Sequence, residues 1–282
     1  MHNTSVTQNI FGHQLHAVIH GTGQPVLCLS GFGCSNYNFE LLKDTLGHFF
    51  QCVLVDNRGM GKSEGPLQEY DIIDLAREAR QFMQQLGHSR YHVIGISMGG
   101  FIAQALTLEF SQEVISLSLL CTTSGAGDFI ELPKITEEAL IAFNQLDKRA
   151  RARYGIKTTV HPSLENENPT LFDWLVDLRA NNTAELQQIL LQKRAVDRFL
   201  SRSWPLESIN RPALIMSGEE DRFVSPQNSQ KLHKIIPNSR LATFPRTDHL
   251  FFFENSKDVS QHIISFLNEC HQTEPPHEYI HR

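Results

Sequence analysis

The 282-residue sequence has no apolar stretch approaching the ~20 residues needed to cross a bilayer, which argues against a membrane-embedded protein. It also has no run of lysine and arginine, and 31 acidic residues outnumber 25 basic ones, for a formal net charge of −6. Because clustered cations are what bind phosphate backbones, nucleic acid is not expected as a partner. The first residues lack the basic and apolar regions of a secretory signal, so none is predicted.

Cysteine is also scarce, and its spacing excludes two kinds of site. The five cysteines are Cys28, Cys34, Cys52, Cys121 and Cys270. They form no C-x-x-C pair, which argues against a zinc site and against dithiol redox chemistry. Three of them lie within apolar runs, where cysteine acts as a small hydrophobic residue. We therefore predict reduced, buried thiols and a cytoplasmic protein.

Short apolar runs alternate with segments of helical period along most of the chain. The runs are almost continuously apolar, as expected for parallel strands that are covered on both faces. They are Pro25–Ser30, Gln51–Asp56, Tyr91–Ile96, Val114–Thr122, Ala213–Gly218 and Arg240–Phe244. Ser5–Phe11 and Gln14–His20 are predicted to form an antiparallel hairpin at the sheet edge. The alternation predicts an α/β fold with a mostly parallel central sheet flanked by helices.

Residues 124–210 interrupt this alternation because they contain no strand-like run. The predicted helices in this region are Thr136–Arg153, Asn168–Asn181 and Thr183–Arg202. Since the strand pattern resumes at Ala213, we interpret the region as a helical cap inserted into one domain rather than as a separate domain. The predicted core then comprises residues 1–123 and 211–270, and residues 271–282 form a polar tail.

The strongest chemical signal is Gly95-Ile-Ser97-Met-Gly99, which has the form G-x-S-x-G. It follows a predicted strand and precedes the apolar helical run Gly100–Phe110. In that context the serine occupies a strained turn above the sheet. The turn also places it at a helix N-terminus, whose N–H groups favour developing negative charge. Ser97 is therefore predicted to be a nucleophile.

A serine nucleophile needs a base, and on this kind of sheet the base is a histidine that comes last in the chain order. Of the fourteen histidines, only His249 lies after all the predicted core strands and before the last predicted helix. It occupies the loop that follows Arg240–Phe244. His249 is therefore the predicted general base.

The base needs an orienting carboxylate. Asp221 lies in the loop after the predicted strand that ends at Gly218, so its carboxylate can face the same rim of the sheet as the serine. Glu219 and Glu220 belong to the same loop and are not excluded by spacing. Asp128, after the preceding strand, is a further alternative.

With these residues in place, the sequence resembles the α/β-hydrolase superfamily over nearly all of its length. Besides the serine motif, Asp56–Ser63 resembles the family's D-x-R-G-x-G-x-S segment, Gly218–Pro226 its acid loop and Asp248–Glu254 its histidine loop. The resemblance implies a catalytic triad of Ser97, Asp221 and His249. Because the nucleophile is serine, the related haloalkane dehalogenases and epoxide hydrolases, which use aspartate, are disfavoured.

An oxyanion hole requires two backbone N–H groups. One is expected from Met98, directly after the nucleophile, and the resemblance implies that the other comes from Phe32. Relatives commonly have His-Gly where this chain has Ser30-Gly31, but a main-chain donor does not depend on that side chain. Cys34 beside this turn has no evident histidine or acid partner and is predicted to be structural.

Two other groups of residues receive structural interpretations. Asp56–Ser63 lacks the spacing of a phosphate-binding loop, so nucleotide binding is rejected and Arg58 is expected to hold backbone carbonyls near the serine turn. His13, His16 and His20 in the predicted hairpin have no acid close to them in sequence. They are interpreted as surface residues, with metal binding as the alternative.

The predicted activity is hydrolysis of a small or medium ester, thioester or lactone through an acyl-enzyme, with no metal or organic cofactor. The cap is expected to cover the triad and to enclose a mostly apolar pocket. Phe32, Phe143 and Trp174 are the predicted substrate contacts.

Three other functions remain open at this stage. The same triad serves cofactor-free C–C hydrolases or lyases and proline iminopeptidases among similar proteins, and some members of the fold are ligand receptors with little turnover. The expected partner is a small-molecule acyl or lactone substrate. The sequence leaves the oligomeric state open between a monomer and a homodimer.

Overall fold

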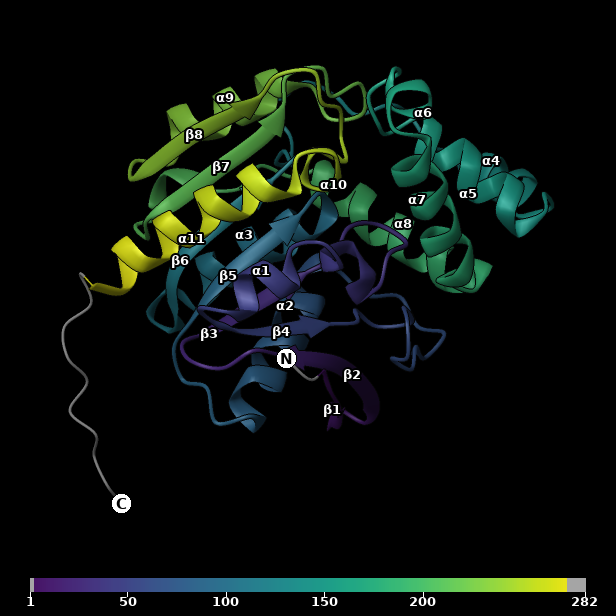
Figure 1. Cartoon of the computed structure of the whole chain (residues 1–282). Helices are drawn as coiled ribbons and strands as arrows, with labels where there is room; N and C mark the ends of the chain where they lie inside the picture. The colour runs from purple at the N-terminus through teal and green to yellow at the C-terminus, as the bar shows by residue number, and fades with distance from the viewer. Residues whose placement is uncertain (1–2, 273–282) are drawn as a thin grey trace.

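A computed structural model of the chain describes residues 3–272 and is built around an eight-stranded sheet (Figure 1). The strand order is β1-β2-β4-β3-β5-β6-β7-β8. The strands are β1 (Thr4–Ile10), β2 (His13–His20), β3 (Pro25–Leu29), β4 (Gln51–Val55), β5 (Tyr91–Ile96), β6 (Val114–Leu120), β7 (Ala213–Gly218) and β8 (Ser239–Phe244). The β1–β2 and β2–β4 pairs are antiparallel and the others are parallel. The predicted α/β fold with a hairpin at the sheet edge is confirmed.

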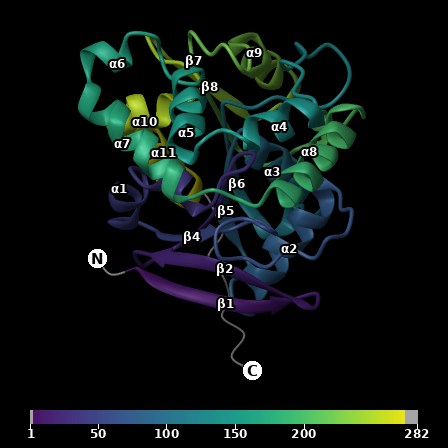
Figure 2. The ribbon, with the colours of Figure 1, turned by 90° about the vertical axis from the view of Figure 1, so that its right-hand side faces the viewer.

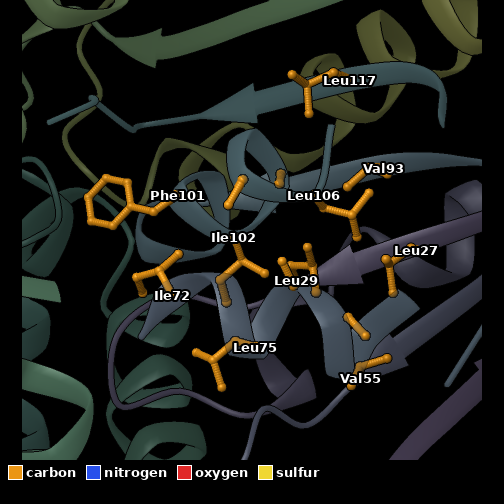
Figure 3. Close-up of a cluster of buried hydrophobic side chains, with 14 of the residues drawn as sticks. Leu27, Leu29, Val55, Ile72, Leu75, Val93, Phe101, Ile102, Leu106 and Leu117 are labelled. Atoms are coloured by element: carbon orange, nitrogen blue, oxygen red, sulfur yellow. The ribbon is translucent and has the colours of Figure 1, made fainter. Parts of the chain in front are cut away.

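Helices cover both faces of this sheet, which is why the parallel strands are apolar on both sides. They are α1 (Lys43–Gly47), α2 (Ile72–Gln85), α3 (Met98–Glu109), α9 (Pro226–Ile235), α10 (Phe251–Glu254) and α11 (Ser256–Gln272). One buried cluster joins strand residues such as Leu29 to Ile72 of α2 and Phe101 of α3 (Figure 3). A second cluster includes Leu46 of α1 and Ile263 of α11. Burial on both faces therefore fixes the positions of the strand ends, after which the predicted triad residues follow.

Five further helices lie between β6 and β7, at the end of the sheet toward which the arrows of β5 and β7 point (Figures 1 and 2). They are α4 (Glu137–Asn144), α5 (Lys148–Lys157), α6 (Leu164–Glu167), α7 (Pro169–Asn181) and α8 (Leu186–Leu200). The single helix predicted over Thr136–Arg153 is wrong, because the chain breaks after Asn144. Asp147 starts α5 by accepting hydrogen bonds from the amides of Arg149 and Ala150.

The interpretation of the hairpin histidines as surface residues is also wrong. His13, His16 and His20 are buried. Each lies within ion-pair distance of an acid from elsewhere in the chain: His13 Nε2 is 3.2 Å from Glu78 Oε1, His16 Nδ1 is 2.8 Å from Asp56 Oδ2, and His20 Nε2 is 3.3 Å from Asp44 Oδ1. The antiparallel hairpin brings these side chains over distant segments, which sequence proximity does not reveal.

The C-terminal boundary differs slightly from the prediction. Helix α11 continues to Gln272, so the first two residues of the predicted tail 271–282 are helical, and residues 273–282 lie outside the described residues. The five cysteines are free thiols, and all except the half-buried Cys34 are buried. Within residues 3–272, none of the helices is both long enough and apolar enough to cross a membrane.

A buried histidine in the central sheet predicts sensitivity to acid. Burial lowers the pKa of His92 on β5 to about 3. An imidazole in the unfolded chain titrates near ~6.5, so below that pH the unfolded state binds a proton that the folded state does not. Stability should therefore fall as the pH is lowered from 6.5 toward 3, by about 2 kcal/mol at pH 5.

Urea unfolding at pH 7 and pH 5 measures this effect. His92→Gln keeps a polar group near Ser116 Oγ, which lies 2.7 Å from His92 Nδ1, but removes the titrating group. Whatever its stability at pH 7, this variant should lose less stability between the two pH values than the wild type. Equal losses in the two proteins would contradict the assignment to His92.

Candidate active site

Ser97 occupies the sharp turn between β5 and α3. Its backbone has φ 54° and ψ −115°, a left-handed conformation that is strained for a residue with a side chain. Three hydrogen bonds hold the turn: the Ser97 amide donates to Leu120 O at 2.9 Å, and Ser97 O accepts from Gly100 N and Thr122 Oγ1, each at 2.8 Å. The neighbouring strand β6 thus fixes a conformation that lifts the hydroxyl above the sheet.

The flanking glycines are required by close backbone contacts. A Cβ atom at Gly95 would overlap the carbonyl group of Gly99, and a Cβ atom at Gly99 would overlap the carbonyl group of Leu29 on β3. The G-x-S-x-G pattern therefore follows from packing of the turn against its neighbouring strand.

The predicted triad residues lie together at the carboxyl ends of three parallel strands. Ser97 follows β5, Asp221 follows β7 and His249 follows β8. His249 Nε2 lies 3.1 Å from Ser97 Oγ, and His249 Nδ1 lies 2.9 Å from Asp221 Oδ2. The other carboxylate oxygen, Asp221 Oδ1, accepts from the amides of Phe223 at 2.9 Å and Val224 at 2.8 Å. This geometry allows a proton to pass from the serine hydroxyl to the imidazole.

The alternative acids lie elsewhere. Glu219 accepts a hydrogen bond from Thr243 Oγ1 at 2.8 Å, and Glu220 Oε2 lies 3.1 Å from His161 Nε2. Asp128 is exposed, and no hydrogen bond joins it to His249. Asp221 is therefore the carboxylate that faces the imidazole.

The histidine loop is held by a hydrogen-bond network around Asp248 and Glu254, and the sequence did not predict its contacts. Asp248 is buried and accepts from the amides of Arg222 at 2.8 Å and His249 at 2.7 Å, and from Arg222 Nε at 2.5 Å. Glu254 accepts from the amides of Asp248 at 2.9 Å and His161 at 2.7 Å. Burial raises the pKa of Glu254, while these two amides oppose the rise. The network ties the histidine loop to the acid loop and to the cap.

The predicted oxyanion turn follows β3 and leaves one amide available. Gly31 N donates to Asn38 Oδ1 at 3.0 Å, and Gly33 N donates to Gln192 Oε1 at 2.6 Å. The Phe32 amide between them donates to no atom of residues 3–272. Gln192 is buried on α8 and was not predicted, because it lies 159 residues away from Gly33 in the sequence.

A cavity of about 940 Å³ opens onto the serine. Phe32, Ser97 and Met98 line its floor, and Phe223, whose ring centre lies 5.1 Å from that of His249, lines it beside the base. Its walls include residues of the segment before α4 and of α8 (Phe129, Ile130, Leu132, Val196 and Leu200). The serine and the two predicted oxyanion donors therefore line one mostly apolar cavity, and His249 contacts the serine from behind this lining.

The two predicted cap contacts lie away from this cavity. Phe143 lines a smaller cavity on the other side of Phe32 and packs against the ring of Tyr154. Trp174 lines neither cavity, and its ring packs against Phe253 at 6.0 Å.

The Asp56–Ser63 segment is structural, but through contacts other than those expected. Arg58 pairs with Glu78 on α2 instead of holding carbonyls near the serine. Asp56 is the anchoring residue, because it accepts from the amides of Asn36 at 2.7 Å and Lys62 at 3.1 Å. No three His, Cys, Asp or Glu side chains within residues 3–272 are grouped as a metal site requires.

Known proteins are similar to this chain over most of its length. The family described as alpha/beta hydrolase fold matches residues 24–256. Lipase 3 of Moraxella sp. strain TA144 is 27% identical over 253 residues, which cover 87% of this chain and 78% of the lipase. A 2-hydroxy-6-oxononadienedioate/2-hydroxy-6-oxononatrienedioate hydrolase of Burkholderia vietnamiensis is 29% identical over 270 residues, 88% of each chain. A thermophilic esterase from Thermogutta terrifontis superposes with a TM-score of 0.81 at 20% identity, covering 95% of this chain and 99% of that one.

Proposed function

This chain belongs to the α/β-hydrolase family, and we propose that it is a serine hydrolase that cleaves a small or medium ester, thioester or lactone through an acyl-enzyme. The observation that carries the proposal is the hydrogen-bonded series Ser97–His249–Asp221, whose serine lines a mostly apolar cavity. Similarity to a lipase over 87% of the chain supports a carboxylic ester as the substrate.

In the proposed mechanism, His249 Nε2 takes the proton of Ser97 Oγ as the oxygen attacks the carbonyl carbon of the substrate. Asp221 accepts from Nδ1–H and so stabilises the imidazolium that forms. The amides of Phe32 and Met98 donate to the developing oxyanion. The imidazolium then protonates the leaving group, and a water molecule activated by the same histidine releases the acid.

Labelling with a fluorophosphonate probe tests the nucleophile. The wild type should label at one serine, and Ser97→Ala should not label. Turnover of p-nitrophenyl acetate then separates an enzyme from a ligand receptor, because a receptor with an intact triad would label without sustained release of nitrophenol. Absence of labelling in the wild type, or equal labelling in Ser97→Ala, would contradict the proposal.

Hydrolysis of a carbon–carbon bond is a second candidate function. The observation that favours it is the similarity to a hydroxy-oxo-dienedioate hydrolase over 88% of both chains. Such a substrate absorbs light through its conjugated system, so loss of absorbance on incubation with enzyme measures this activity directly. Comparison with the ester assay decides which bond the chain cleaves faster.

The cavity wall predicts a limit on acyl length. Val196 on α8 is half-buried in the wall of the main cavity, so Val196→Phe should fill part of the space above the serine. Each methylene bound in an apolar pocket contributes ~0.8 kcal/mol, so we expect the ratio of kcat/KM for octanoate over acetate esters to fall about 10-fold or more. Trp174→Ala is the matched control, because that side chain lines neither cavity and should leave the ratio unchanged. If the ratio changed in Trp174→Ala and stayed the same in Val196→Phe, α7 and not α8 would contact the acyl chain.

A further inference from the structure

The smaller cavity, of about 130 Å³, lies between the cap and the turn that follows β3. Phe32 lines both this cavity and the main one, and it is the residue that the two linings share. Tyr37 from the core lines the smaller cavity, and α5 and α7 contribute Arg151 and Arg179. The cavity therefore adjoins the residue whose amide is the proposed oxyanion donor.

The lining of this cavity carries positive charge and no negative charge. It includes Lys148, Arg151 and Arg179, and it contains no Asp or Glu side chain. Nearby acids are paired with other cations: Asp177, for example, pairs with Arg149, which does not line the cavity. Within the described part of the chain, none of the three lining cations has a carboxylate within 4 Å. In a chain of net charge −6, this unneutralised group is a local exception.

The guanidinium groups also have unused hydrogen-bonding capacity. Arg151 donates to the Asn144 side chain, but its Nε atom is buried and has no partner. Burial raises the pKa of the Tyr37 hydroxyl well above its ordinary value, and the charge of Arg179 opposes that rise. Arg179 therefore acts electrostatically on a wall of the same cavity. A buried donor without a partner is uncommon in proteins and marks a place where a ligand acceptor would be bound.

We infer that this cavity is an anion subsite that binds a carboxylate carried by the acyl group of the substrate. The inference rests on the proposed function and narrows its substrate to short esters or lactones with a free carboxylate a few carbons from the scissile bond. Guanidinium groups match carboxylate oxygens in geometry, and their hydrogen bonds are strengthened by charge and by the apolar surroundings. Because Phe32 lines both cavities, an acyl group bound to Ser97 would have to extend past this residue to reach the subsite.

A pair of esters matched in shape tests the subsite. The p-nitrophenyl monoester of glutaric acid carries the carboxylate, and p-nitrophenyl 5-methylhexanoate has an uncharged branched end of similar shape. We expect the wild type to prefer the anionic ester by about 10-fold or more in kcat/KM, the scale of one hydrogen bond to a charged group. Arg151→Gln and Arg179→Gln should each remove most of this preference by raising KM, and should leave hydrolysis of the neutral ester within about twofold.

Arg149→Gln is the matched control, because Arg149 lies on the same helix but pairs with Asp177 outside the cavity. It should keep the wild-type preference. Hydrolysis of both esters without a preference, or equal loss of both in the arginine variants, would overturn the subsite while leaving the proposed function intact. Failure to hydrolyse either ester would count against the proposed function instead.

Binding of glutarate alone provides a readout that does not depend on turnover. Calorimetry should detect glutarate binding to the wild type, with affinity at least about 10-fold weaker in Arg179→Gln and unchanged in Arg149→Gln. Added salt should weaken binding less than it weakens exposed ion pairs, because the cavity is partly shielded from solvent. If glutarate bound with the same affinity to the wild type, to Arg151→Gln and to Arg179→Gln, the inference would be overturned.

Discussion

Asp221→Asn is expected to lower kcat for a p-nitrophenyl ester by about 10⁴-fold, the scale seen when a triad acid is replaced by its amide. In the wild type, Asp221 Oδ1 is held by the amides of Phe223 and Val224, and Oδ2 faces His249 Nδ1. An asparagine held by the same two amides would place its NH₂ group against Nδ1. The imidazole would then carry its proton on Nε2, the atom that must accept the proton of Ser97.

The neighbouring acids provide controls in the same loop. Glu219→Gln and Glu220→Gln should retain kcat within a few-fold of the wild type, because their side chains contact Thr243 and His161 and not the base. Pre-steady-state release of nitrophenol measures acylation directly, and urea unfolding checks that each variant is folded. A large loss of kcat in Glu220→Gln, together with near-normal acylation in Asp221→Asn, would contradict this assignment. It would mean that Glu220, and not Asp221, orients His249.

The predictions that agree with the structure rest on local patterns. Ser97 was identifiable because a strand, a turn and a helix follow one another within a few residues, and the glycines on either side are dictated by contacts of that same turn. Asp221 and His249 were placed by a weaker rule, namely that each loop follows the carboxyl end of a parallel strand. That rule holds because parallel strands direct their carboxyl ends to one edge of the sheet.

Most of the features that were missed depend on contacts between distant segments. His16 on β2 approaches Asp56 only because β2 pairs with β4, and Gly33 meets Gln192 only because α8 packs back over the turn after β3. The break between α4 and α5 was local, but helical periodicity continues across it, and Asp147 is recognised as a capping residue only once its hydrogen bonds are known. Periodicity predicts which face of a helix is apolar and does not predict which partner that face meets.

Gly99→Ala is expected to destabilise the fold by about 3 kcal/mol or more, in the upper range for overpacking of a core. The new methyl group would overlap the backbone of Leu29 on β3, a strand paired on both sides with β4 and β5. Relief requires movement of a central strand or of the start of α3, since no flexible side chain lies there to give way. Urea unfolding of the soluble fraction measures the loss.

Gly31→Ala is the control for this effect, because it introduces the same methyl group near the same site. There the atom nearest to the added Cβ is Ser97 Cβ at 3.4 Å, which is an ordinary contact distance. The free energy of unfolding of this variant should therefore lie within about 1 kcal/mol of the wild-type value. The comparison isolates the effect of the close backbone contact: Gly99→Ala should lower the free energy of unfolding strongly, whereas Gly31→Ala, with the same added methyl group, should not. If the two variants proved equally stable, the close approach of the serine turn to β3 would be incorrect, and the strained backbone of Ser97 would need another support.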